Sequence, residues 1–227
     1  MTIHEGTARP ADKKADANQL CSDCTRTRLY LVRHGELTTS HEWRYVGQKM
    51  DVDLSEMGIR QIRMLSGRLR KENLHVILSS DLKRTRHSAQ IIGDACGGIS
   101  PIACREFREI HLGHWEGLTL DEIAQQYEGE LQERMENIGG FRIEGGESFT
   151  DVQRRVMPKL YSCMRNNKGK NVLVVAHGGV NRVVLSSVLG LELNAVNRIE
   201  QSYACLNIID FYDDGPVIQL VNETVQC

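Results

Sequence analysis

Aromatic residues, long apolar runs and an excess of one charge are all missing from this sequence. Only 5% of the 227 residues are Phe, Trp or Tyr, so a buried core has to consist mainly of aliphatic side chains. The apolar run at residues 172–176 is far shorter than the roughly 20 residues that a membrane-spanning helix needs. The 28 Lys and Arg residues nearly balance the 30 Asp and Glu residues, for a net charge of −2. These features argue against nucleic acid and membranes as binding partners.

Cysteine is present but is not arranged as in a disulfide-rich secreted protein. The number is odd and the seven residues are scattered, at positions 21, 24, 96, 104, 163, 205 and 227. The N-terminal residues lack the apolar stretch of a signal peptide, so we expect the protein to work in the reducing cytoplasm. Cys21-x-x-Cys24 has neither the second ligand pair of a zinc site nor the flanking strand and helix of a redox motif. We interpret it as two exposed thiols.

The first 27 residues differ from the rest of the chain. They are polar, lack hydrophobic periodicity and contain Pro10 and two adjacent lysines, Lys13 and Lys14. We expect residues 1–27 to form a flexible extension. Residues 28–227 are numerous enough to bury a sizeable core and are expected to form one domain.

Apolar runs and helical periodicity alternate from residue 28 onward. Continuous apolar runs, which suit strands covered on both faces of a parallel sheet, lie at residues 29–32, 76–78 and 172–176. Apolar spacing and a capping box predict helices at residues 56–70, 82–94, 148–165 and 180–189. Late strands are expected at residues 203–210 and 216–221, joined by an Asp-Asp-Gly-Pro turn. The alternation predicts an α/β fold, a three-layer α/β/α sandwich with a mostly parallel central sheet.

Basic and imidazole side chains follow three of the predicted strands. Arg33 and His34 come after the first strand, Arg84 follows the second, and His177 follows the strand at residues 172–176. Because ligands of open α/β sheets bind at the carboxyl ends of the strands, we expect these side chains to share one crevice. Arg matches phosphate oxygens two at a time, and an unprotonated imidazole can attack phosphorus. The sequence therefore indicates a phosphate pocket.

Glycines and a helix start support the same pocket. Gly35 and Gly178 would let the backbone approach a ligand closely, and a helix beginning just after Gly179 would aim free N–H groups at an anion. On charge alone, Lys83 or Arg86 could take the place of Arg84 as the relevant cation.

Several motifs occur in order along this part of the chain. They lie at residues 31–36 (Leu-Val-Arg-His-Gly-Glu), 51–58, 79–85 (Ser-Ser-Asp-Leu-Lys-Arg-Thr), 108–117, 145–148 (Gly-Gly-Glu-Ser) and 174–179 (Val-Val-Ala-His-Gly-Gly). Together they resemble the histidine phosphatase superfamily, in its phosphoglycerate-mutase-like branch. The resemblance covers residues 28–210 and implies that residues 28–227 are a histidine phosphatase domain.

The resemblance implies a role for each catalytic residue. His34 would be the nucleophile that becomes phosphohistidine, while Arg33, Arg84 and His177 would bind the phosphoryl oxygens. Glu109 would protonate the leaving oxygen and later take a proton from the attacking water. Spacing alone leaves neighbouring glutamates as alternatives to Glu109, and the family pattern selects it. The resemblance implies neither a metal nor a cofactor.

Departures from the family pattern bear on substrate binding. Many relatives have, six residues after the nucleophile, an Asn that donates to phosphate, where this chain has Ser40, a hydroxyl donor with a shorter reach. Ser40 and Gly178 are expected to contact the substrate phosphate. The segment at residues 37–46 is expected to rim the pocket, or to be an ordinary surface loop. The mutases have an Arg and a Tyr where this chain has Ile110 and Leu112.

The same comparison favours a phosphatase over a mutase. The mutases also carry a longer insert with an Arg pair, whereas residues 118–144 are compact here. The expected substrate is a small phosphorylated metabolite. The Gly-Gly-Glu-Ser motif, together with Gln201, Cys205 and Asn207, is similar to α-ribazole phosphatase, which removes the 5′-phosphate of a cobalamin precursor. Phosphoglycerate mutase and broad phosphatases of sugar and glycolytic phosphates stay as alternatives, and a homodimer stays open.

Overall fold

The computed structural model describes residues 26–39 and 44–225 of the chain. Cys21-x-x-Cys24 and most of the expected flexible extension lie outside the described residues. Strand β1 (Thr27–Arg33) begins one residue earlier than the expected domain boundary. The reason is that Thr27 is only 3% exposed and its hydroxyl accepts a hydrogen bond from the Gly169 N–H at 3.1 Å.

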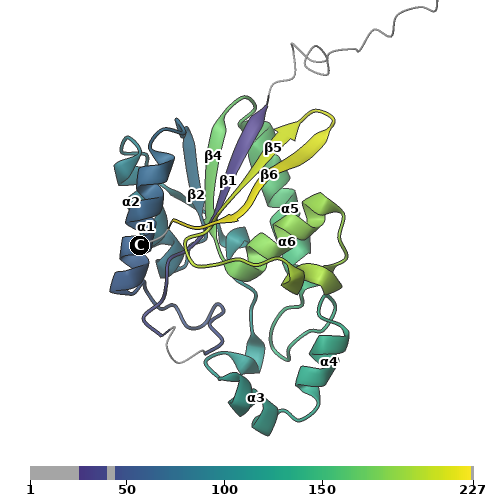
Figure 1. The fold of residues 1–227 in the computed structure, drawn as a ribbon. Coiled ribbons are helices and arrows are strands. Elements are labelled where there is room, and N and C mark those ends of the chain that lie inside the picture. The colour runs from purple at the N-terminus through teal and green to yellow at the C-terminus, as the bar shows by residue number, and fades with distance from the viewer. Residues whose placement is uncertain (1–25, 40–43, 226–227) are drawn as a thin grey trace, which may run out of the picture.

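A six-stranded sheet forms the centre of the molecule (Figure 1). From one edge to the other the order is β3, β2, β4, β1, β5, β6, with bounds Ile102–Ala103, Val76–Ser79, Asn171–Ala176, Thr27–Arg33, Leu206–Tyr212 and Gly215–Glu223. The pairs from β3 to β1 are parallel, and β5 is antiparallel to both of its neighbours. The predicted mostly parallel central sheet is therefore confirmed.

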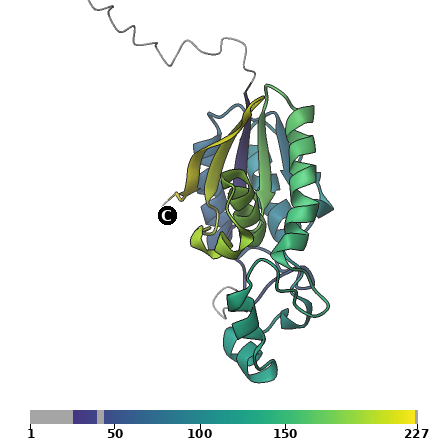
Figure 2. The ribbon, with the colours of Figure 1, turned by 90° about the vertical axis from the view of Figure 1, so that its right-hand side faces the viewer.

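Helices cover both faces of this sheet, as Figures 1 and 2 show. On one face lie α1 (Glu56–Leu69) and α2 (Lys83–Ala95), and on the other lie α5 (Phe149–Asn166) and α6 (Gly178–Leu189). The predicted capping box is present, since the Ser148 side chain accepts from the Asp151 N–H and the Asp151 carboxylate accepts from the Ser148 N–H. The three-layer α/β/α sandwich expected from the sequence is confirmed.

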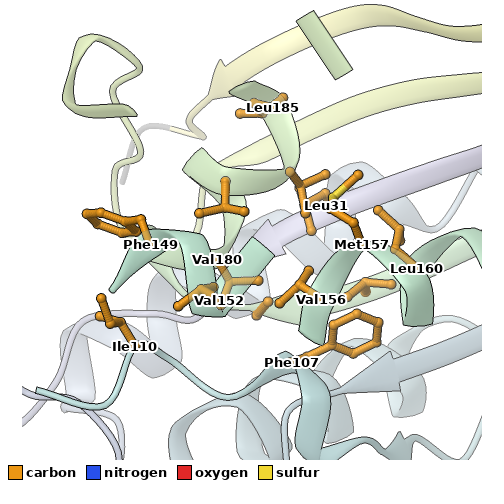
Figure 3. Close-up of a cluster of buried hydrophobic side chains, with 14 of the residues drawn as sticks. Leu31, Phe107, Ile110, Phe149, Val152, Val156, Met157, Leu160, Val180 and Leu185 are labelled. Atoms are coloured by element: carbon orange, nitrogen blue, oxygen red, sulfur yellow. The ribbon is translucent and has the colours of Figure 1, made fainter. Parts of the chain in front are cut away.

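Alternate residues of each central strand supply the two cores. Tyr30 and Val32 point to the α1 and α2 face, whereas Leu29 and Leu31 pack against α5 and α6. Figure 3 shows part of the second core, with Val152 and neighbouring α5 side chains lying beside residues of α6 and β1. These side chains are almost fully buried, which explains why the strand sequences are continuously apolar rather than alternating.

A small lobe lies beyond the carboxyl ends of the central strands, at the end of the molecule opposite the start of β1 (Figures 1 and 2). We call residues 105–147 the cap lobe. Its helical segments are short: Arg105–Phe107 and Gly113–Trp115 are 3-10 turns, and α3 and α4 span Leu120–Gln126 and Glu130–Glu136. A further 3-10 segment, Leu193–Arg198, follows α6. The sequence predicted none of these, because such short helices show no clear apolar period.

Two boundaries differ from the expected ones near the carboxyl ends of the strands. Strand β5 starts at Leu206 rather than at residue 203, because Ala204 adopts a left-handed conformation (φ 53°) and its N–H donates to the His34 carbonyl at 3.0 Å. Helix α6 starts at Gly178, with His177 as N-cap, rather than at residue 180. Among the described residues, no helix combines the length and the apolarity needed to cross a bilayer.

Candidate active site

Three parallel strands bring the expected side chains to one edge of the sheet. Strand β4 lies between β1 and β2, so the segments that follow all three strands emerge side by side. The His34 N–H donates to the Ala176 carbonyl at 3.2 Å, which ties the end of β1 to the end of β4. Arg84 enters the same region from the first turn of α2. The crevice expected from the sequence is formed.

The two imidazoles face each other at this edge. The ring centroids of His34 and His177 are 5.2 Å apart, and the two residues are 4% and 0% exposed. His34 Nδ1 lies 2.8 Å from the Gly35 carbonyl oxygen, which can only accept, so Nδ1 carries the hydrogen and Nε2 keeps its lone pair. His177 has the opposite arrangement: its Nδ1 accepts from Arg84 Nε at 3.2 Å, so its hydrogen is on Nε2.

The surroundings keep both imidazoles neutral. Burial lowers the pKa of His34 well below its ordinary value, and the positive charges of Arg84 and Arg33 lower it further. The pKa of His177 is lowered well below its ordinary value for the same reasons, burial first and Arg84 next. At neutral pH, His34 therefore presents an unprotonated nitrogen, and His177 presents a hydrogen-bond donor.

Two guanidinium groups flank the imidazoles. Arg84 is 1% exposed and donates to the Gly47 carbonyl at 2.6 Å. Burial lowers the pKa of Arg84, and its guanidinium keeps its charge because arginine is not deprotonated in proteins. Arg33 donates through one terminal nitrogen to the Gln201 carbonyl at 2.6 Å, and its Cζ lies 4.0 Å from the centroid of the Tyr203 ring.

Among the buried donors at this edge that have no hydrogen-bond partner within the described residues, two belong to the expected phosphate-binding side chains. They are Arg33 Nε and His177 Nε2. A buried polar group without a partner costs about 1–3 kcal/mol, so native structures rarely keep one without a reason. An anion with several oxygens, such as a phosphoryl group, would satisfy both donors at once.

Glu109 reaches the site from the cap lobe. Its Oε1 accepts from the Ile110 N–H at 2.9 Å and its Oε2 accepts from the Gly179 N–H at 3.1 Å. The second bond places the carboxylate at the N-terminus of α6, where the helix dipole favours negative charge. Gly179 is needed there, because an added Cβ would lie 2.5 Å from Glu109 Oε1. At Gly178 an added Cβ would make only ordinary contact with Arg33, at 3.4 Å from its Nε.

A pocket of about 610 Å³ opens above these groups. Arg33, His34, Glu109 and Gly179 line its inner end, while Arg84 and His177 lie buried beneath the lining. The segment at residues 37–46 was expected either to rim the pocket or to be an ordinary surface loop. Its described part lines the pocket, through Leu37, Thr39 and residues 44–46. Ser40, expected to bind phosphate, lies outside the described residues.

The geometry thus brings together Arg33, His34, Arg84, Glu109 and His177, and a family comparison agrees with it. The sequence model of the Histidine phosphatase superfamily (branch 1) matches residues 29–224. This chain belongs to the histidine phosphatase superfamily. The enzyme class predicted from the sequence motifs, a histidine phosphatase, is confirmed.

Individual relatives of this histidine phosphatase differ in their named activities. A protein named probable phosphoglycerate mutase GpmB from Yersinia pestis is 34% identical over 202 residues, covering 87% of this chain and 93% of the relative. The native structure of a mycobacterial glucosyl-3-phosphoglycerate phosphatase has a TM-score of 0.80 at 26% identity, covering 88% of this chain and 100% of that one. An Escherichia coli structure, provisionally assigned as an alpha-ribazole-5'-P phosphatase, has a TM-score of 0.79 at 22% identity, with coverage of 88% and 98%, and shows the shared fold.

The Gly-Gly-Glu-Ser motif of this histidine phosphatase holds the loop that carries Glu109. Glu147 of the motif binds Arg155, with Arg155 Nε 2.8 Å from its Oε1. Arg155 in turn donates to the Glu109 carbonyl at 3.0 Å, and Gln48 donates to the same oxygen at 2.8 Å. The motif is therefore connected to the site through the backbone of Glu109. Sequence reasoning used it only as a mark of resemblance.

Glu116 likewise holds a loop at the site, and the sequence analysis missed this role. Its carboxylate accepts three backbone N–H groups, from Gly47 at 3.0 Å, Gln48 at 3.2 Å and Met50 at 2.8 Å. The carbonyls of Gly47 and Met50 are the backbone groups that accept from Arg84, at 2.6 and 3.4 Å. Glu116 thus shapes the loop that holds Arg84. The only sequence signal is an acidic residue inside a matched motif.

No cluster of three or more His, Cys, Asp or Glu side chains suited to a metal ion occurs in the described part of the chain. Positive charge at the site comes from Arg33 and Arg84, and hydrogen-bond donors come from these residues and His177. The arrangement can bind a phosphoryl group, offer it a nucleophile and supply a carboxyl group for proton transfer.

Proposed function

We propose that this protein hydrolyses small phosphate monoesters through a phosphohistidine formed on His34, without a metal ion. The observation that carries the proposal is the bond from His34 Nδ1 to the Gly35 carbonyl. It leaves Nε2 unprotonated and directed away from that carbonyl, in a setting that keeps the ring neutral. An imidazole held in this way is a nucleophile at neutral pH.

The proposed reaction has two steps, transfer of the phosphoryl group to His34 and hydrolysis of the phosphohistidine. His34 Nε2 attacks phosphorus, the bond from phosphorus to the leaving oxygen breaks, and protonated Glu109 gives that oxygen a proton. Water then attacks the phosphohistidine, the nitrogen–phosphorus bond breaks, and Glu109 takes the water proton. Arg33, Arg84 and His177 stabilise the charge on the phosphoryl oxygens in both steps.

Water, rather than a second metabolite, is the proposed acceptor of the phosphoryl group. The pocket wall next to Glu109 carries Ile110 and Leu112, which are 5% and 4% exposed and cannot grip a carboxylate. The second candidate is a 2,3-bisphosphoglycerate-dependent phosphoglycerate mutase, and the 34% identity to a protein named probable phosphoglycerate mutase GpmB favours a mutase. Release of inorganic phosphate without interconversion of phosphoglycerates would exclude it.

Two phosphate esters are specific candidates for the substrate. The sequence motifs suggest α-ribazole 5′-phosphate, and the names of structural relatives add glucosyl-3-phosphoglycerate, while broad action on sugar phosphates stays an alternative. Three further points stay predictions: a location in the cytoplasm, a role in cobalamin synthesis and assembly into a homodimer.

The decisive experiment is His34→Ala, assayed with phenyl phosphate in the presence of EDTA. Turnover should fall to background, and acid-labile, base-stable radioactive phosphate should be trapped on the unsubstituted protein but not on the variant. His75→Ala is the matched control, because His75 is exposed and precedes β2 at the opposite end of the sheet. Unchanged turnover in His34→Ala would refute the proposal.

A further inference from the structure

The pocket carries more positive charge than a transferring phosphoryl group requires. Among its described lining residues, Glu109 is the single carboxylate, whereas Arg33, Arg44, Arg134 and Arg182 are all cations. With about 610 Å³ of space, the pocket also holds far more than one phosphate group. The side chains farther from His34 therefore have room to contact the part of the substrate that is not transferred.

Arg134 is the most unusual of these cations. It projects from α4 of the cap lobe, and its Cζ lies 5.6 Å from the centroid of the Trp115 ring and 5.3 Å from that of Phe149. One of its terminal nitrogens is buried and has no hydrogen-bond partner, and no carboxylate among the described residues forms an ion pair with it. Burial lowers the pKa of Arg134.

The position of Arg134 is fixed by its own helix. Glu130, one turn earlier on α4, accepts from Trp115 Nε1 at 2.7 Å and lies 2.9 Å from His114 Nε2. Residues i and i+4 share a helix face, so this anchor sets Arg134 over the Trp115 ring. The guanidinium is thereby held against the pocket before any ligand arrives.

Packing alone does not account for a guanidinium at this place. Arg134 is half-buried, and burying even one nitrogen of a charged group without a counter-ion has a cost that the aromatic faces return only in part. A methionine or leucine would fill the space between Trp115 and Phe149 without the cost. An anion bound in the pocket would supply the missing partner.

The other pocket cations differ in the interactions that they already make within the protein. Arg33 belongs to the phosphoryl site, and Arg44 lies 3.0 Å from the Glu122 carboxylate. Arg182, on α6, donates through Nε to the Ile199 carbonyl at 2.9 Å, which orients its terminal nitrogens without neutralising the charge. Arg134 and Arg182 thus form a pair of cations outside the phosphoryl site, one from each side of the pocket.

We propose that Arg134, assisted by Arg182, binds a second anionic group of the substrate, so that the enzyme acts on phosphate monoesters that also carry a carboxylate or a second phosphate. This specificity rests on the proposed phosphatase function. It ranks glucosyl-3-phosphoglycerate and other phosphorylated acids above α-ribazole 5′-phosphate, which has no second anionic group. The compact segment at residues 118–144 thereby supplies a cation despite lacking the longer insert of the mutases.

Matched substrates test the proposal. 3-Phosphoglycerate and glycerol 3-phosphate differ by a carboxylate in place of a hydroxymethyl group, and fructose 1,6-bisphosphate and fructose 6-phosphate differ by one phosphate. We expect kcat/KM to be at least tenfold higher for the doubly anionic member of at least one pair. In Arg134→Met, which keeps contacts with the aromatic rings, that ratio should fall about 10- to 100-fold, as expected for loss of a charge-assisted hydrogen bond.

Controls separate this proposal from the proposed function. Arg134→Lys should keep part of the ratio, and Arg165→Met, which removes an exposed charge from α5, should leave the ratio unchanged. Equal kcat/KM values within both pairs, or an equal loss for both members in Arg134→Met, would overturn the second anion site. Absence of His34-dependent hydrolysis of phenyl phosphate would instead overturn the proposed function.

Discussion

Glu116→Gln tests whether Arg84 owes its orientation to the loop at residues 47–50. In the structure one carboxylate oxygen accepts from Gly47 and Met50, and the other accepts from Gln48. A glutamine can keep the first pair of bonds but must turn its NH₂ group toward the Gln48 N–H, so two donors face each other. The substitution changes few atoms and removes one acceptor and the negative charge.

The size of the effect follows from this hydrogen-bond count. A buried donor left without its acceptor costs about 1–3 kcal/mol, and the two remaining bonds weaken because their acceptor is no longer charged. The site is only partly buried, so we expect the lower half of that range, a loss of about 1–2 kcal/mol. We expect the loop at residues 47–50 to move when these bonds weaken. If the Gly47 carbonyl moves with it, Arg84 loses its shortest hydrogen bond, and kcat/KM should fall roughly tenfold.

Kinetics and inhibition distinguish positioning from a general loss of stability. Hydrolysis of phenyl phosphate gives kcat and KM, competitive inhibition by inorganic phosphate reports on Arg84, and urea denaturation gives the free energy of unfolding. The inhibition constant for phosphate should rise by about the same factor as kcat/KM falls. Glu128→Gln is the control, since Glu128 is exposed in the same lobe. A variant with the expected stability loss but unchanged kinetics and phosphate inhibition would refute the reasoning.

The remaining predictions concern proton transfer, glycine contacts and pH. Glu109→Gln should slow alkyl phosphates, whose leaving groups need a proton, far more than nitrophenyl phosphate; equal losses would remove Glu109 from the acid role. Gly179→Ala should lower kcat more than melting temperature, because its Cβ would mainly displace the flexible Glu109 carboxylate and would also press on Phe149 Cε1 at 3.3 Å. Gly35→Ala should destabilise the protein, because its Cβ would lie 2.4 Å from a backbone oxygen. His34 and His177 are held neutral by burial, so the unfolded chain binds more protons below its histidine pKa of about 6.5 and stability should fall as pH drops through that value, by up to about 1.4 kcal/mol per pH unit for each residue. Urea titrations between pH 7.5 and 5.5 measure this slope, which should shrink in His34→Ala; an unchanged slope in that variant would contradict the assignment.

The residues that follow the central strands could be placed from the sequence because two signals coincide there. Continuous apolar runs identify buried parallel strands, and parallel strands share an edge, so Arg33, His34 and His177 had to meet. The helices that cover the sheet, such as α1 and α5, were predictable because they are long enough to show a period and have Ser caps.

The contacts that no local sequence pattern predicted join distant segments. The family resemblance alone selected Glu109. Glu109 binds the N-terminus of α6, and Glu116 binds a loop roughly 70 residues earlier, so neither contact leaves a local pattern. Arg134 sits in a short polar helix whose sequence resembles any exposed helix. Its partial burial arises from Trp115 and Phe149, which come from other parts of the chain.

The pairing of β1 with β4 has a consequence for synthesis on the ribosome. Arg33 lies beside Ala176 in register, so the strand that carries the nucleophile is made 143 residues before its neighbour. At about 5–20 residues per second, β1 waits roughly 7–30 s for that partner, with Leu29–Val32 lacking the strand that later covers one edge. Nascent chains should therefore acquire phosphatase activity late and abruptly, and stalling translation before β4 should yield chains that chaperones bind.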